Sequence, residues 1–384
     1  MNLHKTVELA RKFLLGLGVG MGIVILLFIF FQFGMFIRNT YFPPEIEPPT
    51  QLYGQLPSIS FPQSTVTGTF SYTINTLTGT LPQFTDRLTV FPIEQPEPNL
   101  LNITKARDKA AQLDFTTLEG DPLPEIKTNE ETYTWNQQDF LQRTLTMNVI
   151  SFNFTYDTQY LSPDAPLGYP IRDELDTVNT VSNFLQTISL TPVDLDIQKT
   201  LTPNEEQKFT TKPQLFFIEN GELVQTNLLA NARVVRVDLY QQDIAYSLDI
   251  GKINSQGEKV VEQIQLPIVY PYPPYSTMSF WVASNNNKDA VVAANFSHQQ
   301  IIRDISEPAT YPIKTATEAF EELQAGKAYI AAFHGNTTSI AINTIYLAYY
   351  LGETPQQYLM PIIVFEGDNG FFAYVSAIKN EWIQ

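Results

Sequence analysis

One uninterrupted apolar stretch near the start of the chain constrains everything that follows it. Residues 13–37 read FLLGLGVGMGIVILLFIFFQFGMFI, carry no charge, and include only Gln32 as a strongly polar side chain. A helix of this length extends roughly 37 Å, enough to cross a hydrocarbon core of about 30 Å. In lipid every backbone amide needs an internal hydrogen-bond partner, so such a stretch is stable there only as a helix. The sequence therefore predicts a single transmembrane helix at 13–37.

Basic residues before this stretch predict the orientation of the chain. Lys5, Arg11 and Lys12 precede it, against a single Glu8. An excess of Lys and Arg keeps the flanking segment in the cytoplasm. Residues 1–12 are thus expected to be a cytoplasmic N-terminus, with an extracytoplasmic remainder and a location in the cell membrane. The alternative is a cleaved signal peptide, whose apolar region is usually only about 7–15 residues long, so the sequence favours an uncleaved signal-anchor.

Four glycines recur at every second position of the stretch: Gly16, Gly18, Gly20 and Gly22. Small residues four apart let two helix backbones approach closely. The spacing predicts a helix–helix contact, either a homodimer or docking on the membrane helix of a partner. The alternative is that glycine is simply frequent in membrane helices.

Composition excludes several classes of function. The whole chain carries a formal net charge of −17, and because residues 1–38 carry +3, the remaining 346 residues carry −20. An acidic body repels phosphate backbones, which argues against nucleic-acid binding. The absence of cysteine excludes disulfides, thiolate nucleophiles and cysteine-ligated metals, and no motif implies another metal or a cofactor.

Residues 38–62 contain six prolines and separate the apolar stretch from the globular part. Dense proline favours an extended conformation and excludes helix interiors, so a semi-rigid stalk is expected. The alternative is an irregular lead-in that packs on the first domain, since the segment contains the apolar side chains Leu52, Tyr53, Ile59 and Phe61.

Beyond the stalk, the pattern of one amphipathic helix among strands of period two occurs three times. The expected helices lie near 102–113, 175–188 and 316–323, and the last begins with a capping box, Thr315 to Glu318. Asn220-Gly221 between apolar runs indicates a hairpin. The fold class is therefore α+β, with tandem modules of antiparallel sheet, each covered by one helix, at 63–165, 166–305 and 306–384.

Several residue groups in the last module match a known family. They are Tyr311-Pro-Ile, Thr317-Glu-Ala319, Leu323-Gln-Ala-Gly326, Tyr346-Leu-Ala-Tyr-Tyr350, Leu359–Gly367 and Ala373–Ala377. This module resembles the C-terminal module of the YycH/YycI family, single-pass regulators that act outside the membrane on a sensor histidine kinase. It also looks like PepSY-type domains, which regulate or inhibit partners. The chain departs from the family with Ile362-Ile363-Val364 and Ser376, where tryptophan and asparagine are usual.

Candidate catalytic residues are few. Only His298 and His334 accompany the cytoplasmic His4, and no His-Glu-x-x-His or Gly-x-Ser-x-Gly motif occurs. Both outer histidines are expected to be hydrogen-bonded turn or surface residues. Three carboxylate pairs lie two residues apart and are expected to be solvated turns rather than glycosidase or calcium sites: Asp194 with Asp196, Glu119 with Asp121, and Glu366 with Asp368.

An aromatic cluster near a Pro-rich joint is the remaining candidate site: Tyr270, Tyr272, Tyr275 and Trp281. Aromatic faces with few charges can stack on sugar rings or hold a peptide. The alternative is that these side chains wedge the joint between modules.

These features together predict a non-catalytic membrane protein. Its expected role is to regulate or scaffold another envelope protein through the extracytoplasmic part. The alternative role is a glycan- or peptide-binding module of the cell envelope that uses the tyrosine-rich surface. A carboxylate-based hydrolase is the weaker third interpretation.

Overall fold

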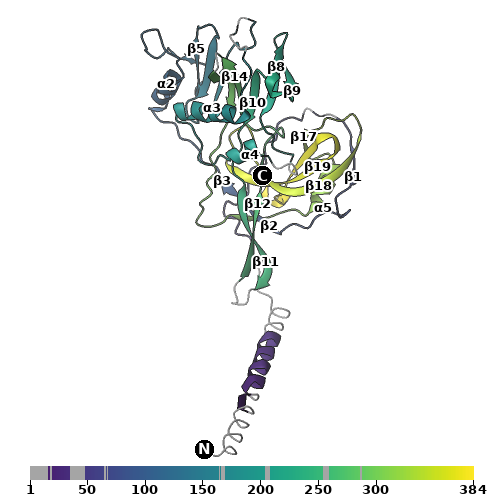
Figure 1. Cartoon of the computed structure of the whole chain (residues 1–384). Coiled ribbons are helices and arrows are strands. Elements are labelled where there is room, and N and C mark those ends of the chain that lie inside the picture. The colour runs from purple at the N-terminus through teal and green to yellow at the C-terminus, as the bar shows by residue number, and fades with distance from the viewer. Residues whose placement is uncertain are drawn as a thin grey trace, which may run out of the picture. The chain divides into compact units, whose positions relative to one another are not determined.

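The computed structural model describes residues 16–17, 20–34, 48–64, 66, 68–163, 165, 169–203, 208–253, 259–285 and 288–384 (Figure 1). The chain forms two compact units, Met1–Pro48 and Pro49–Gln384.

In the first unit, residues 20–34 are helical and their large apolar side chains are exposed, as at Val24 and Phe30. Residues 1–15, 18–19 and 35–47 lie outside the described part, and with them the ends of the predicted transmembrane helix. No helix among the described residues has both the length and the apolar character needed to cross a membrane. The transmembrane prediction is therefore not confirmed.

The second unit contains a nine-stranded antiparallel sheet in the order β4-β5-β6-β7-β15-β14-β10-β8-β9. Strands β6 and β7 alternate buried and more exposed side chains, whereas strand β10 is buried on both faces except at Arg236. Strands β8 and β9 form the hairpin predicted at Asn220-Gly221. The bounds are β4 Ile126–Lys127, β5 Thr132–Gln137, β6 Arg143–Asn148, β7 Phe154–Asp157, β8 Gln214–Glu219, β9 Glu222–Thr226, β10 Val234–Asp238, β14 Met278–Asn285 and β15 Lys288–Phe296.

Helices α2 (Asn102–Gln112) and α3 (Glu174–Thr187) pack on the apolar face of this sheet (Figure 1). The α3 side chains Val178, Val181 and Leu185 recur at helical spacing and are fully buried against β10 and β14. Asp173 begins α3 by accepting a hydrogen bond from the backbone N–H of Leu175. The short helix α4 (Ile197–Leu201) begins in the same way at Asp196.

A seven-stranded sheet forms the second core, in the order β1-β18-β19-β20-β17, with β13 also paired to β18 and β3 to β19. Apolar clusters cover both of its faces, and α5 (Ala316–Gln324) buries Ala319 and Leu323 in one of them. The predicted capping box of α5 is present. The bounds are β1 Ser71–Ile74, β3 Phe91–Pro92, β13 Ile268–Val269, β17 Tyr329–Ala332, β18 Ser339–Tyr350, β19 Tyr358–Gly367 and β20 Phe371–Ser376.

Two smaller strand pairs and three short 3-10 helices complete the unit. Strand β2 (Arg87–Thr89) pairs with β16 (Thr310–Pro312), and β11 (Ile244–Ile253) pairs with β12 (Lys259–Leu266) as a long ribbon. The 3-10 helices are η1 Leu229–Asn231, η2 Asp368–Gly370 and η3 Asn380–Trp382. The α+β fold class is confirmed in this coarse form.

The sheets do not follow the expected module boundaries at 165 and 305. Strand β1, from the expected first module, pairs in parallel with β18, so that Ser71 lies opposite Ser339. Strand β7 of that same module pairs with β15 of the second. The described strands therefore assort mainly into two sheets rather than three. The periodicity of a strand indicates its buried face but not its pairing partner, which explains the difference.

Residues 49–62 are not a free stalk. Leu56 is fully buried and bridges Ile383, and the Tyr53 ring stacks on Tyr358 at 4.7 Å between centroids. Phe61 stacks on Tyr329. The alternative interpretation, a lead-in that packs on a domain, is correct for this segment, although the domain is the C-terminal one. Residues 38–47 lie outside the described part.

Candidate functional site

A pocket of about 360 Å³ lies over the centre of the nine-stranded sheet. Three central strands supply its floor: Arg236 of β10 lies opposite Trp281 of β14, and Ser279 of β14 lies opposite Asn295 of β15. Alternate residues of β10, Val235 and Val237, belong to the core under α3. The pocket therefore lies on the sheet face opposite the helices.

Arg236 is held in a fixed position within this pocket. Its Nε and Nη2 donate to the two oxygens of Asp238 at 2.9 and 3.0 Å. Its guanidinium carbon lies 3.9 Å from the ring centroid of Tyr275 and 5.2 Å from that of Trp281. A planar guanidinium suits both a forked ion pair and stacking on aromatic faces. The cation is thus preorganised between two rings.

Asp238 is the buried partner of this cation, with 1 % of its side chain exposed. Burial raises the pKa of the Asp238 carboxyl above its ordinary value, while the guanidinium of Arg236 opposes the rise. The backbone N–H of Ser276 also donates to Oδ1 at 3.0 Å. Both carboxylate oxygens are therefore engaged in hydrogen bonds, and Asp238 is a structural anchor of the pocket rather than an acid or base facing a ligand.

The Pro-rich joint and the other sheet form the rim. Tyr272 is 38 % exposed, and the exposed Glu353 follows β18 of the seven-stranded sheet. The joint is fixed by two tyrosine hydroxyls, Tyr240 donating to the carbonyl of Pro274 at 2.7 Å and Tyr329 to that of Pro271 at 3.0 Å. The pocket thus lies where the two sheets of the second unit meet, a common location for ligand sites.

The structure separates the four aromatic residues singled out in the sequence. Tyr272, Tyr275 and Trp281 line the pocket. Tyr270 does not, because it is buried against Tyr240 and its hydroxyl accepts from the backbone N–H of Gln241. Tyr270 is therefore a buried packing residue rather than part of the pocket lining. Sequence reasoning missed Arg236, Asn295 and Glu353; the available signal was the Arg-x-Asp pair inside the apolar strand VVRVD.

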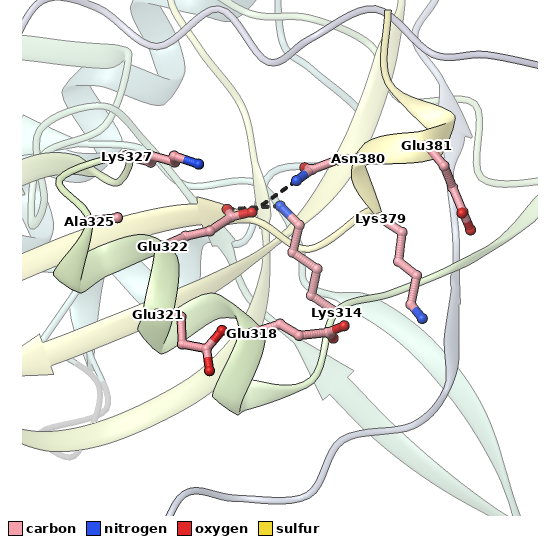
Figure 2. Close-up of a pocket in the computed structure, with 9 residues that line it drawn as sticks. All are labelled: Lys314, Glu318, Glu321, Glu322, Ala325, Lys327, Lys379, Asn380 and Glu381. Atoms are coloured by element: carbon pink, nitrogen blue, oxygen red, sulfur yellow. Dashed lines mark hydrogen bonds and ion pairs between the residues drawn. The ribbon is translucent and has the colours of Figure 1, made fainter.

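A larger, strongly charged hollow of about 570 Å³ lies beside α5 (Figure 2). Its centre is Glu322, which accepts from Lys314 at 2.9 Å and from the side-chain amide of Asn380 at 3.1 Å. Figure 2 shows Lys327 and Lys379 around the same hollow, together with three further carboxylates from Glu318, Glu321 and Glu381. It has no aromatic wall and carries both charge signs, so its geometry suits a solvated surface better than a ligand site.

Two of the paired carboxylates are not in solvated turns as expected, because Asp194 and Glu366 are each only 4 % exposed. His298 contacts Asp194 at 2.9 Å, and Gln241 donates to the other Asp194 oxygen at 2.7 Å. Burial raises the pKa of Asp194, but the contact with His298 and the other donors outweigh it, and the net pKa is lowered. Asp196 caps α4. In the described part of the chain, no three acidic or histidine residues are grouped to hold a metal ion.

The glycine pattern of the first unit is described only in part. A Cβ added at Gly16, Gly20 or Gly22 would meet no atom within 4 Å. Gly18 lies outside the described residues. The predicted helix–helix contact stays a prediction.

No family model and no curated protein matches the chain. Solved structures similar to it include the C-terminal domain of YpeB from Bacillus megaterium, at 10 % identity and a TM-score of 0.28, covering 74 % of this chain and 95 % of that one. An uncharacterized protein from Eubacterium rectale ATCC 33656 is similar at 9 % identity and a TM-score of 0.34, covering 81 % of this chain and 88 % of that one. Likeness at this level transfers no function, and the resemblance to YycH/YycI is not confirmed.

Proposed function

We propose that this chain is a membrane-anchored, extracytoplasmic binding protein that takes an envelope glycan or peptide into its aromatic pocket without transforming it. The observation that supports the proposal is Arg236, fixed between Tyr275 and Trp281 in a pocket at the junction of two sheets. A binding site needs such preorganised side chains. Among the described residues, Glu353 is the only acidic side chain that lines this pocket. A glycosidase needs two carboxylates on either side of the bond that it cleaves, so this lining argues against a carboxylate-based hydrolase.

In-cell photocrosslinking tests the binding role. A photoreactive amino acid in place of Tyr272 should capture glycan or peptide fragments of the envelope, identified by mass spectrometry. The matched control is the same substitution at Tyr169, which is 42 % exposed and does not line the pocket. Equal capture at both positions, or capture at neither, would contradict the proposal.

The proposed topology has a sharp test, because the chain contains no cysteine. In intact cells, a membrane-impermeant maleimide should label Leu118→Cys, whose side chain is fully exposed. Lys5→Cys should be labelled only after lysis. The orientation would be refuted if, before lysis, the maleimide labelled neither variant or labelled only Lys5→Cys.

A second candidate role is regulation or scaffolding of a protein partner, as the YycH/YycI-like residues imply. The β11–β12 ribbon supports it, since among the described strands β11 and β12 pair only with each other. Such a ribbon offers backbone edges to a partner strand. The predicted membrane helix would add a second contact through Gly18 and Gly22. Replacing both glycines by Ile should then abolish crosslinking of full-length chains. Unchanged crosslinking would exclude this helix–helix contact.

A further inference from the structure

Some polar groups of the aromatic pocket are donors and acceptors without protein partners, although Ser276 and Thr277 in its lining are hydrogen-bonded to backbone carbonyls. Among the described residues, the side chains of Tyr272, Asn295 and Glu353 make no hydrogen bond to protein, and neither does Nη1 of Arg236. The Asn295 amide both donates and accepts, the Glu353 carboxylate accepts, and Nη1 donates. Hydroxyl groups, which also donate and accept, complement this set.

The aromatic walls add a surface that suits the C–H face of a ring. Tyr272 is exposed, and Tyr275 and Trp281 are partly exposed beside it. An aromatic ring next to hydrogen-bonding groups binds a ligand that is apolar on one face and polar at its edge. A volume of about 360 Å³ is near the lower limit for small-molecule pockets, so the pocket suits one or two ring-sized units.

The charges of the site argue against a charged ligand. The guanidinium of Arg236 already occupies one face of Tyr275, 3.9 Å from its centroid, and would repel an ammonium group placed nearby. An anion gains little from Arg236, since Asp238 neutralises it and Glu353 lines the rim. The acidic body, with its charge of −20, repels anions further.

The strands beneath the pocket argue against an extended peptide. Arg236, Trp281 and Asn295 lie on β10, β14 and β15, and each of these strands has a hydrogen-bonded neighbour on both sides. No strand edge is free there to pair with a peptide backbone, which is the usual way a sheet holds one. Recognition must therefore come from side chains.

Resting on the binding role proposed above, we propose that the ligand of this pocket is a neutral saccharide, with a sugar ring stacked on Tyr272 or Trp281 and its hydroxyls bonded to Asn295, Glu353 and Nη1 of Arg236. This assigns a chemical class to the site and assigns Asn295 and Glu353 a role in specificity.

Isothermal titration of the full-length chain with defined ligands tests this assignment. The chain is kept in a phosphocholine detergent, because sugar-headed detergents would compete for the site. The probes are cellobiose, N,N′-diacetylchitobiose, a neutral tetrapeptide, and glucuronic acid as the anionic comparison. We expect binding of at least one neutral disaccharide, and at least tenfold weaker binding of glucuronic acid.

Three variants locate the binding. Tyr272→Ala and Asn295→Ala should each weaken saccharide binding about tenfold, the size expected for one lost stacking or hydrogen-bonding contact. Tyr169→Ala is the matched control and should bind as the natural chain does. Circular dichroism melts of all three variants test whether unfolding causes any loss of binding. We expect Tyr272→Ala to remain folded, because the Tyr272 side chain is exposed.

The outcomes separate this inference from the proposed function. Peptide binding that Tyr272→Ala weakens, without saccharide binding, would overturn the saccharide assignment and preserve the binding role. Saccharide binding unchanged in Tyr272→Ala and Asn295→Ala would overturn the assignment of the site. Binding of none of the four probes, together with equal photocrosslinking at 272 and 169, would overturn both.

Discussion

The two large sheets of the second unit differ in how much of their two faces is covered by apolar side chains. In the seven-stranded sheet, apolar clusters cover both faces, and nine consecutive residues of β19, Leu359–Gly367, are buried. One of the nine is charged: Glu366 lies 3.1 Å from Lys208. In the nine-stranded sheet, one face is apolar under α2 and α3. The other face has a smaller apolar cluster around Val234, Ala283 and Val292, together with the Arg236–Asp238 pair and the aromatic pocket. Departure from the apolar rule is most often found at functional sites. We therefore expect the seven-stranded sheet to contribute most of the stability, whereas the proposed binding role depends on the nine-stranded sheet.

The largest expected effect tests the apolar side of the comparison. Phe365 of β19 is fully buried and packs on Phe320 of α5, with 6.2 Å between ring centroids. Phe365→Ala should reduce the free energy of unfolding by about 3–5 kcal/mol, because it removes apolar contacts and leaves a cavity. Urea denaturation followed by circular dichroism measures it. A loss below about 1 kcal/mol would mean that this sheet is not the stabilising core.

The next largest effect tests the Arg236–Asp238 pair of the nine-stranded sheet. Arg236→Met keeps an apolar stem but leaves Asp238 buried without its cation, which should cost about 3 kcal/mol at pH 7. Burial already raises the pKa of Asp238, and losing Arg236 should raise it further. The folded variant would then bind a proton more readily than the unfolded chain, so its deficit should shrink as the pH falls.

The matched control for that variant removes both charges. Arg236→Met with Asp238→Leu should recover much of the lost stability, since replacing a buried pair by apolar residues is often neutral. Saccharide binding should still be weak in the double variant, because Nη1 of Arg236 is absent. A double variant as unstable as Arg236→Met would show that packing, rather than the buried charge, causes the loss.

Sequence patterns were informative where a structural feature is local. The capping box at Thr315, the Asn220-Gly221 hairpin and the apolar stripe of α3 all depend on neighbours within a few residues, and all are confirmed. The pairing of β1 with β18 depends on contacts across most of the chain, so periodicity gave no indication of it.

The pocket was predictable only in part for the same reason. Its aromatic residues Tyr272, Tyr275 and Trp281 are close in sequence and were singled out together. Arg236 comes from β10, which is distant in sequence, and reaches the pocket through the pairing of β10 with β14. Glu353 follows β18 and reaches the pocket where the two sheets meet. Pro-rich composition likewise did not reveal that Leu56 is buried against the C-terminal end of the chain.

An intermediate effect is expected at the junction of the sheets. Asp194 accepts from Gln241 and contacts His298, and the neighbouring Gln299 donates to the carbonyl of Gly352, which follows β18. Asp194→Asn should cost about 2 kcal/mol at pH 7, the usual contribution of hydrogen bonds to a buried charged group.

The stability lost in Asp194→Asn should depend on pH in a defined direction. The pKa of Asp194 is lowered in the folded chain, so its contribution is complete above the ordinary pKa of 3.8 and is lost as the pH falls through the lower folded value. The difference between Asp194→Asn and the natural chain should therefore be constant from pH 7 to 5 and shrink below pH 4. A constant difference down to pH 2 would contradict the assigned charge network; thermal melts across this range provide the measurement.

The smallest expected effect compares the stability contributed by the capping box of α5 with that contributed by the solvated charges beside it. Thr315 accepts from the backbone N–H of Glu318, whose carboxylate accepts in return from the backbone N–H of Thr315. Thr315→Ala should cost about 1 kcal/mol and Thr315→Ser much less, because serine keeps the capping oxygen. Lys327→Ala, in the charged hollow of Figure 2, should change stability by less than about 0.5 kcal/mol, since exposed charges contribute little. Urea denaturation ranks the three variants. If Lys327→Ala cost more than Thr315→Ala, the hollow would be a structured site, and recognition could not be assigned to the nine-stranded sheet alone.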